Sequence, residues 1–434
     1  MSAAPEQNSR PSHKRAVVFV VLLLVLLALL ALALRWVAQP ERMAGLLLDR
    51  IGAALGLQIS ASGASEYRLR GTPTLVLRDV VAREPGAATP VLRARRVYLS
   101  LPWSTIRARG RDLTVERIEL DAPQIDLPAL QHWQATRPPA EKRFPTLTAG
   151  LRISDGAIAN DNWRVDRIHA DLPSLYPDRP MQARLRGRYL DPPLAIPVDL
   201  AVAITRPQAL IQSGVTGFAA HGRVTLERGD WRMPATLALS GPLRLGDDQL
   251  QVTPARLGMA AAYESGTTRL PFALGLHSPL VFDEATWTLA PAGVALRGRG
   301  ATDTDPVPTL DAHGTLALGR RVSGQLDGVI AQWPQAWPAL PPPIGQSRSP
   351  LPFALRYDGK PDFSDTAALR LRRDATVFDG RFRLPEVLAW TKAAASGSPL
   401  PPIDGTLSTP TLVISGATLE GVEIEFDDGQ SPLL

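Results

Sequence analysis

Apolar and polar residues alternate at every second position over much of the chain, and this pattern restricts the fold more than any other. The alternation is clearest in six stretches, at residues 181–189, 194–204, 218–226, 270–276, 310–318 and 422–426. A period of two gives a β-strand one apolar face and one polar face. A sheet with one polar face is typical of antiparallel pairing. The sequence therefore predicts a mainly β protein built around a long antiparallel β-sheet.

Such a sheet has an apolar face that few helices are available to cover. Residues 40–57 have apolar positions at helical spacing, and residues 386–395 form a second, short candidate helix. An apolar face must be buried against another layer or against a ligand. Two folds satisfy this condition. The sheet curves into an apolar groove that receives a molecule with long apolar parts, or it closes on itself as a β-sandwich or barrel.

The stretch 194–204 has the longest uninterrupted apolar stripe, because all six of its alternate positions are apolar. In the groove fold, this stripe and similar positions on other strands face the bound molecule. The residues that we expect to line the groove are Leu151, Ile153, Leu194, Ile196, Val198, Leu200, Val202, Ile204, Phe218, Val224 and Leu226.

Two short segments recur at irregular spacing. Residues 271–274 (Pro-Phe-Ala-Leu) recur as 352–355, and 221–226 (His-Gly-Arg-Val-Thr-Leu) resemble 313–318 (His-Gly-Thr-Leu-Ala-Leu). One interpretation is coincidence in a chain rich in Ala, Leu, Arg and Gly. The other is a long meander of hairpins, with glycine in mid-strand where the strands bend sharply.

Residues 16–34 form a run of 19 residues without a charge. As a helix it is roughly 28 Å long, close to the hydrocarbon thickness of a bilayer. Lys14 and Arg15 precede it, so the positive-inside rule predicts a cytosolic N-terminus and export of the rest. The alternative is a cleaved signal peptide, since residues 31–33 (Ala-Leu-Ala) match the cleavage pattern, but the length favours an uncleaved anchor. The anchor residues are Val17, Phe19, Leu23, Leu27, Leu30 and Leu34.

These signals divide the chain into four parts. Residues 1–15 are a basic cytosolic tail, 16–34 a single transmembrane anchor, 35–145 an N-terminal module and 146–434 the long β region. The boundary near residue 145 is placed at the proline-containing interruption 128–145.

The residues that carry chemistry are scattered or missing. The chain has no cysteine, and its six histidines are widely spaced, so the sequence predicts no metal site, no cofactor and no catalytic residue. Beyond residue 34 there are 44 basic and 41 acidic residues, and they are interleaved. A nucleic-acid-binding protein has a segregated basic face, so we expect no nucleic-acid partner.

Three stretches have a recognisable pattern of their own. Residues 93–103 read RARRVYLSLPW and lead into 113–127, LTVERIELDAPQIDL, while 151–158 read LRISDGAI. Together with the anchor, the helix that follows it and residues 403–426, they resemble the AsmA family of bacterial envelope proteins over about a third of the chain.

The resemblance implies a single-pass inner-membrane protein of a Gram-negative envelope. It implies a chorein-like N-terminal module and a periplasmic β-groove that conveys phospholipid and supports outer-membrane assembly, with no catalysis. The expected partners are membrane phospholipid, the inner membrane and outer-membrane assembly proteins. Two other classes stay open from the residues alone: a periplasmic scaffold that carries no lipid, and an anchored hydrolase with an unrecognised site.

Overall fold

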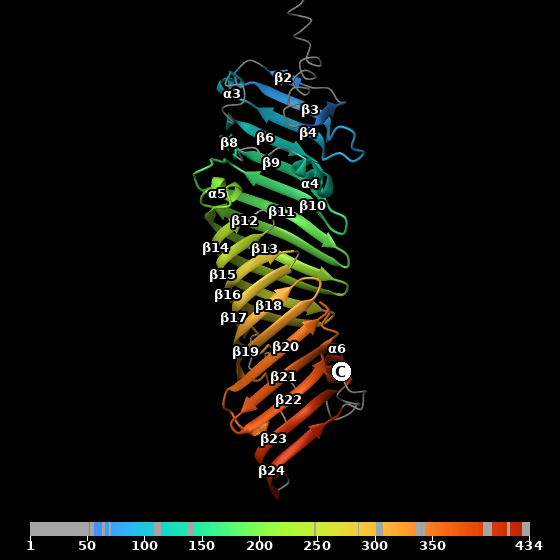
Figure 1. Ribbon diagram of the computed structural model, residues 1–434, viewed down its shortest axis with the longest axis vertical. Helices are drawn as coiled ribbons and strands as arrows, with labels where there is room; N and C mark the ends of the chain where they lie inside the picture. Colours follow the sequence, from blue (N-terminus) through green and yellow to red (C-terminus); the bar gives the residue numbers. More distant parts are fainter. Residues whose placement is uncertain are drawn as a thin grey trace, which may run out of the picture.

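The computed structural model describes residues 52, 56–62, 66–68, 71–107, 114–136, 143–246, 249–284, 286–300, 307–334, 340, 343–393, 402–414 and 417–427. It is mainly β, with 68% strand, and 22 of its strands form one mixed sheet. Figure 1 shows the strands following one another along the long axis of the molecule, tilted to that axis, with β24 at the end. The prediction of a mainly β protein is confirmed.

The first part of the sheet is built from short strands. Their bounds are β1 (Gln58–Ala61), β2 (Glu66–Arg68), β3 (Thr74–Arg83), β4 (Leu92–Ser100), β6 (Arg117–Asp121), β7 (Gln124–Asp126), β9 (Leu151–Ala159) and β10 (Arg164–Leu172). Both β1 and β2 pair with β3, which pairs with β4. Both β6 and β7 lie between β4 and β9.

The rest of the sheet is a meander in which each strand pairs with the next in sequence. The bounds are β11 (Met181–Asp191), β12 (Leu194–Ile204), β13 (Val215–Arg228), β14 (Trp231–Leu245), β15 (Leu250–Ser265), β16 (Thr268–Asp283), β17 (Thr286–Gly298), β18 (Thr309–Leu318), β19 (Val322–Gln332), β20 (Leu351–Gly359), β21 (Thr366–Arg373), β22 (Thr376–Arg383), β23 (Ile403–Ile414) and β24 (Ala417–Phe426). All six stretches of predicted alternation lie within strands, and 194–204 matches β12 at both ends.

The prediction of antiparallel pairing needs one correction. Every pair from β9 to β24 is antiparallel, but β6 and β7 pair with β9 in parallel. A parallel pair needs a crossover connection. Residues 127–150 supply it, and they contain helix α4 (Leu127–Ala135) and strand β8 (Thr146–Leu147), which pairs with β5 (Thr114–Val115) in a separate two-stranded sheet. The ladder thus continues across the boundary predicted near residue 145.

The helices bounded within the described residues are short. Besides α4, they are α3 (Trp103–Arg107), α5 (Pro207–Ile211), α6 (Leu384–Ala393) and a 3₁₀ turn, η1 (Ile344–Gln346). The carboxylate of Asp126 caps α4 by accepting a hydrogen bond from the backbone N–H of Ala129 at 2.9 Å. The helix predicted at 386–395 corresponds to α6, whereas most of the one predicted at 40–57 lies outside the described residues.

Four consecutive strands bend at prolines that lie side by side. The ladders from β14–β15 to β17–β18 each shift register once, between residues 240 and 243, 252 and 255, 277 and 280, and 289 and 292. Each strand has a proline inside its shift, and we call these four the proline row: Pro242, Pro254, Pro279 and Pro291. Proline cannot donate to the ladder, and a register irregularity bends the strand. The row therefore creases the sheet along its long axis.

Two mid-strand glycines allow neighbouring strands to approach each other closely. Gly222 in β13 and Gly314 in β18 have φ of +149° and +156°, values that other residues rarely adopt. A Cβ atom at Gly314 would lie 1.9 Å from the carbonyl oxygen of Gln325, and one at Gly222 would lie 2.1 Å from that of Asp199. Both glycines follow the histidine of the repeated segment. The glycine of the repeated segment thus has a similar φ at both places.

Candidate functional site: one apolar face along the sheet

The ladder register places apolar side chains on the same face of the sheet from strand to strand. Residues directly opposite in an antiparallel pair point to the same side. Leu200 lies opposite Leu185 on β11 and Gly222 on β13, and Gly222 lies opposite Leu237 on β14. Leu237 in turn lies opposite Met259 on β15.

The same face continues to both ends of the sheet. Toward the C-terminus it carries, in order of pairing, Leu274, Leu296, Leu310, Ile330, Leu351 and, further on, Leu371, Phe378, Leu407 and Ile424. Toward the N-terminus it carries Ile153, Leu120, Val97 and Leu77, and Ile59 packs against the cluster of Leu77 and Val80. We call this surface the inner face, and the opposite one the polar face.

All eleven residues predicted to line a groove lie on the inner face. Leu194, Ile196, Val198, Leu200, Val202 and Ile204 lie on β12, with Phe218, Val224 and Leu226 on β13 and Leu151 and Ile153 on β9. Ten of them are half-buried, while Ile204 is 8% exposed. The prediction therefore identified neighbouring side chains of one surface, although it covered only part of that surface.

Inner-face side chains beside the proline row are fully buried. Beside the proline row, the inner-face side chains Val252, Ala255 and Ala292 are 2%, 0% and 1% exposed. Leu210 of α5 packs against Val252 and Ala255, so a single short helix covers the sheet there. Away from the crease, inner-face residues such as Leu237 and Leu274 are half-buried.

Toward the C-terminus a different element covers the inner face. Trp333, Leu340 and Ile344, from the connection between β19 and β20, pack on a cluster of Ile330, Leu351, Leu371 and Leu407. Leu351 and Leu407 are 0% and 1% exposed. Arg373, which is 8% exposed, donates from Nη1 to the carbonyl oxygens of Ile344 and Ser347, both at 2.9 Å, and so holds this connection against the sheet.

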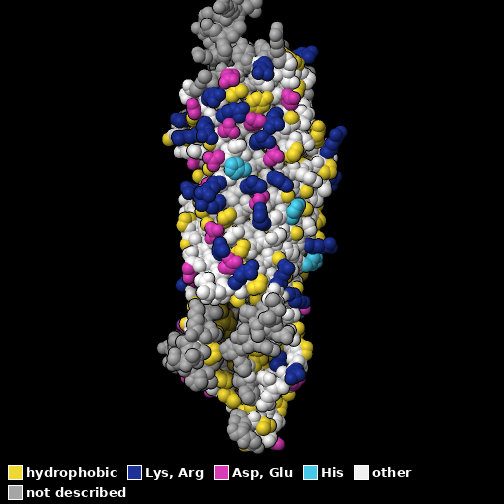
Figure 2. All heavy atoms as spheres, turned by 180° about the vertical axis from the view of Figure 1, so that it is seen from behind, with side chains coloured by type: hydrophobic (Ala, Val, Ile, Leu, Met, Phe, Trp, Pro, Cys, Tyr) yellow, Lys and Arg dark blue, Asp and Glu magenta, His cyan; other side chains and the backbone are white. Residues whose placement is uncertain are grey.

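The polar face is held together by ion pairs between neighbouring strands. Asp199 on β12 lies 3.2 Å from Arg186 on β11 and 3.4 Å from Arg223 on β13. Glu264 on β15 lies 2.7 Å from Arg232 on β14 and 3.2 Å from Arg269 on β16. Figure 2 shows basic and acidic side chains interleaved over one side of the molecule. The interleaving seen in the sequence thus corresponds to cross-strand pairs.

The same pairing lowers carboxyl pKa values. Hydrogen bonds from the Arg188 guanidinium at 2.9 and 3.0 Å hold the pKa of Asp166 below its ordinary value. The pKa of Asp199 is also lowered, because Arg186 and Arg223 outweigh the opposing effect of burial. These carboxylates stay charged and structural, with no proton to exchange near neutral pH.

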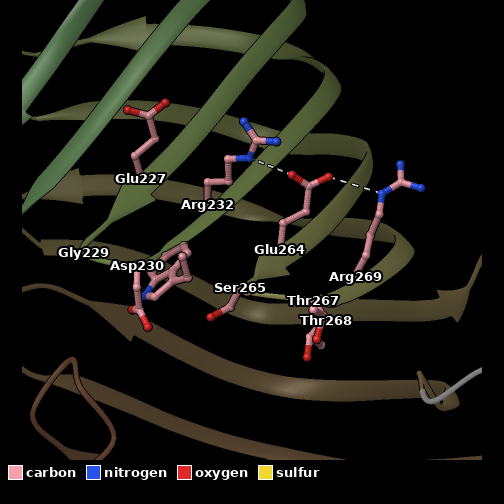
Figure 3. A pocket seen from close by; sticks show the side chains of 11 residues that line it. Glu227, Gly229, Asp230, Arg232, Glu264, Ser265, Thr267, Thr268 and Arg269 are labelled. Atoms are coloured by element: carbon pink, nitrogen blue, oxygen red, sulfur yellow. Dashed lines mark hydrogen bonds and ion pairs between the residues drawn. The ribbon is translucent and has the colours of Figure 1, made fainter.

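Pairs of aromatic rings lie where the inner face meets the hairpin ends. Trp231 lies 5.8 Å from Tyr263, between ring centroids, and Phe282 lies 4.7 Å from Trp287. Around Trp231, the ends of the β13–β14 and β15–β16 hairpins enclose a depression of about 550 Å³. Figure 3 shows Arg232 and Arg269 pointing toward Glu264, with Glu227 and Asp230 beside them. The depression is open to solvent, and within it Glu264 pairs with both Arg232 and Arg269.

Among the described residues, no group of three or more His, Asp or Glu side chains could hold a metal ion. His221 and His313 are exposed on the polar face, as the alternation predicted. The anchor residues Val17, Phe19, Leu23, Leu27, Leu30 and Leu34 lie outside the described residues. Within the described part of the chain, no helix is both long enough and apolar enough to cross a bilayer.

No family model, no curated protein and no solved structure matches the chain.

Sequence reasoning missed two features of the inner face. The first is the proline row, whose four members are apart in the sequence and are brought together by the hairpin register. The second is the cover over the C-terminal cluster, which comes from the connection between β19 and β20. Both depend on which strand lies beside which, and single stretches of sequence do not contain that information.

Proposed function

We propose that the chain is a non-enzymatic lipid-conveying protein of the bacterial envelope, similar to the AsmA family. In this proposal the inner face is an apolar groove that holds the acyl chains of phospholipid. The sequence resemblance described above supports the family, and the inner face supports the activity.

The observation that carries the proposal is the continuity of the inner face across the ladder. An acyl chain of about 16 methylenes resists exposure to water by roughly 13 kcal/mol, at about 0.8 kcal/mol per methylene. A continuous apolar surface removes most of that barrier and needs no catalytic group. The half-buried side chains of β11–β14 leave apolar area available to such a ligand.

The length of the sheet fits the same purpose. β1 and β2 share one position in the ladder, as do β6 and β7, so the strands occupy about 20 positions. At about 4.8 Å per strand the ladder is roughly 100 Å long, and protein side chains cover its inner face near α5 and over β19–β23. We propose that a chorein-like module at 35–145 begins it near the inner membrane, where residues 16–34 anchor the chain.

A lipid adduct test addresses the proposal directly. A photo-crosslinking residue at Leu200, on the inner face, should yield phospholipid adducts by mass spectrometry when the full chain is purified in mild detergent. The matched control is the same residue at Ala201, which lies opposite Arg184 and His221 on the polar face. Absence of lipid at Leu200, or equal adducts at both positions, would contradict the proposal.

The proposed topology has its own test. A reporter enzyme fused after Leu434 should be active when the reporter is one that functions only in the periplasm. Activity of a reporter that functions only in the cytosol would contradict export of the β region and the cytosolic N-terminus.

One observation favours a second function, a periplasmic scaffold for outer-membrane assembly proteins without lipid carriage. The inner face around Leu351 and Leu407 is already filled by protein side chains. If the scaffold reading is right, Leu200 gives no lipid adduct although the chain is folded and exported.

A further inference from the structure

The sheet ends at β24 with an unpaired edge in the described part of the chain. β24 spans ten residues and pairs only with β23 there. Figure 1 shows it as the last strand at one end of the molecule. The outer edge of such a strand presents backbone N–H and C=O groups to any chain that can extend the sheet.

Two carboxylates on interior strands of the polar face have arginine partners on both neighbouring strands. Asp199 and Glu264 each have one arginine on the strand before and one on the strand after. Opposite charges at facing positions stabilise a pair of strands. A carboxylate on an interior strand can therefore form ion pairs with arginines on both neighbouring strands.

The glutamates of β24 lack this arrangement. Glu423 and Glu425 are exposed on the polar face, opposite Ser408 and Thr406 of β23. Neither forms an ion pair with another described residue. On the inner face the same strand presents Ile424 and Phe426, both half-buried. β24 therefore has the same alternation of polar and apolar residues as the interior strands.

A second copy of the chain fits this edge poorly. Two β24 strands paired antiparallel about Ile424 would place Glu423 of one copy opposite Glu425 of the other, and like charges at facing positions are destabilising. At the other end of the sheet, the edge formed by the described residues consists of β1 and β2, of four and three residues. Neither matches a ten-residue edge.

We infer that the outer edge of β24 binds a β-strand of another protein. That strand has arginine or lysine at the alternate positions that face Glu423 and Glu425, and apolar residues between them. The basic residues give Glu423 and Glu425 the kind of charge pairing that Asp199 and Glu264 already have. The apolar residues extend the inner face by one strand. This inference is independent of whether the inner face carries lipid.

The test uses the full chain in detergent and two labelled peptides of about eight residues. One alternates arginine and valine, and the other alternates glutamate and valine. By fluorescence anisotropy at low salt, the basic peptide should bind about tenfold more tightly than the acidic one, since two facing charge pairs distinguish them. A photo-crosslinker in the basic peptide should label residues of β24.

Two variants separate pairing at the edge from general electrostatic attraction. The double change Glu423→Arg with Glu425→Arg should reverse the preference, and Glu423→Gln with Glu425→Gln should reduce it without reversal. The control Glu227→Arg with Asp230→Arg makes the same change in net charge at a distant hairpin and should leave the preference intact. Melting curves establish that each variant is folded.

Three outcomes would overturn the inference: equal binding of the two peptides, a preference unchanged by the charge reversal at β24, or crosslinks that map outside β24.

Discussion

The inner face is covered to different extents in two parts of the sheet. Over β11–β14, large apolar side chains such as Ile196 and Leu237 are half-buried, and the cover lies at the crease near α5 and at the start of β11, where Met181 and Ala183 pack against Leu147 and Leu175. Over β19–β23, the β19–β20 connection buries Leu351 and Leu407 almost completely. We call these the open stretch and the covered stretch. Strands with the same alternation of apolar and polar residues can therefore form a half-exposed apolar surface or a buried core. The difference is whether a connection packs over them.

The largest expected difference between the two stretches is their response to a buried charge. Leu407→Asp places a carboxylate in the covered cluster without a partner, which costs several kcal/mol and should unfold that stretch. Ile196→Asp lies on the half-exposed surface and should cost about 1 kcal/mol or less, because water reaches the new group. Thermal melts of the two variants measure this, and equal losses of Tm would erase the distinction between the stretches.

The second prediction concerns what holds the open stretch in shape. Because few side chains cover the open stretch, we expect the bending of its strands to contribute as much to its stability as packing does. Gly222→Ala, on β13, combines a strained φ with a Cβ position 2.1 Å from the backbone oxygen of Asp199, and should cost about 3 kcal/mol. Gly187→Ala, on β11, is the matched control, because a Cβ there comes no closer than 3.6 Å to another atom. Similar urea midpoints for both variants would contradict the role of the bend.

The third prediction addresses the cover itself. Arg373→Met keeps an apolar stem but leaves the carbonyl oxygens of Ile344 and Ser347 without their donor, at a cost of about 1–3 kcal/mol. Loosening should be confined to the covered stretch. Hydrogen exchange should therefore rise around η1 and β21 while β12 and β13 stay unchanged. A uniform rise would show that the two stretches unfold as one unit.

The smallest expected effect belongs to the polar face. Because Arg188 lowers the pKa of Asp166, the ion pair stabilises the fold at pH values above the ordinary carboxyl pKa of about 3.8. This stabilisation is lost as the pH falls through the lowered folded-state pKa. Asp166→Asn should lower Tm by roughly 1–2 °C at neutral pH and by less at acidic pH. A Tm difference that grows on acidification would contradict the sign.

The sequence was sufficient for the strands but not for their arrangement. Alternation located β12 at both ends, because apolar side chains occur at every second position when only one face is wet. It also put His221 and His313 on the polar face. It could not reveal the parallel pairing of β6 with β9, since parallel and antiparallel strands share a period of two. Nor could it align Pro242 with Pro254, because their alignment depends on hairpin register.

The nearest-neighbour meander has a consequence for how such a protein changes in size. From β9 to β24 every ladder joins strands that are adjacent in sequence, so the sheet is close to one-dimensional, and each hairpin adds about 10 Å. Deleting a whole hairpin shortens the molecule and leaves every later turn on its own rim. Deleting a single strand moves all later turns to the opposite rim. Insertions and deletions in this region are therefore tolerated in pairs of strands, and the reach of the protein is adjusted in hairpin steps.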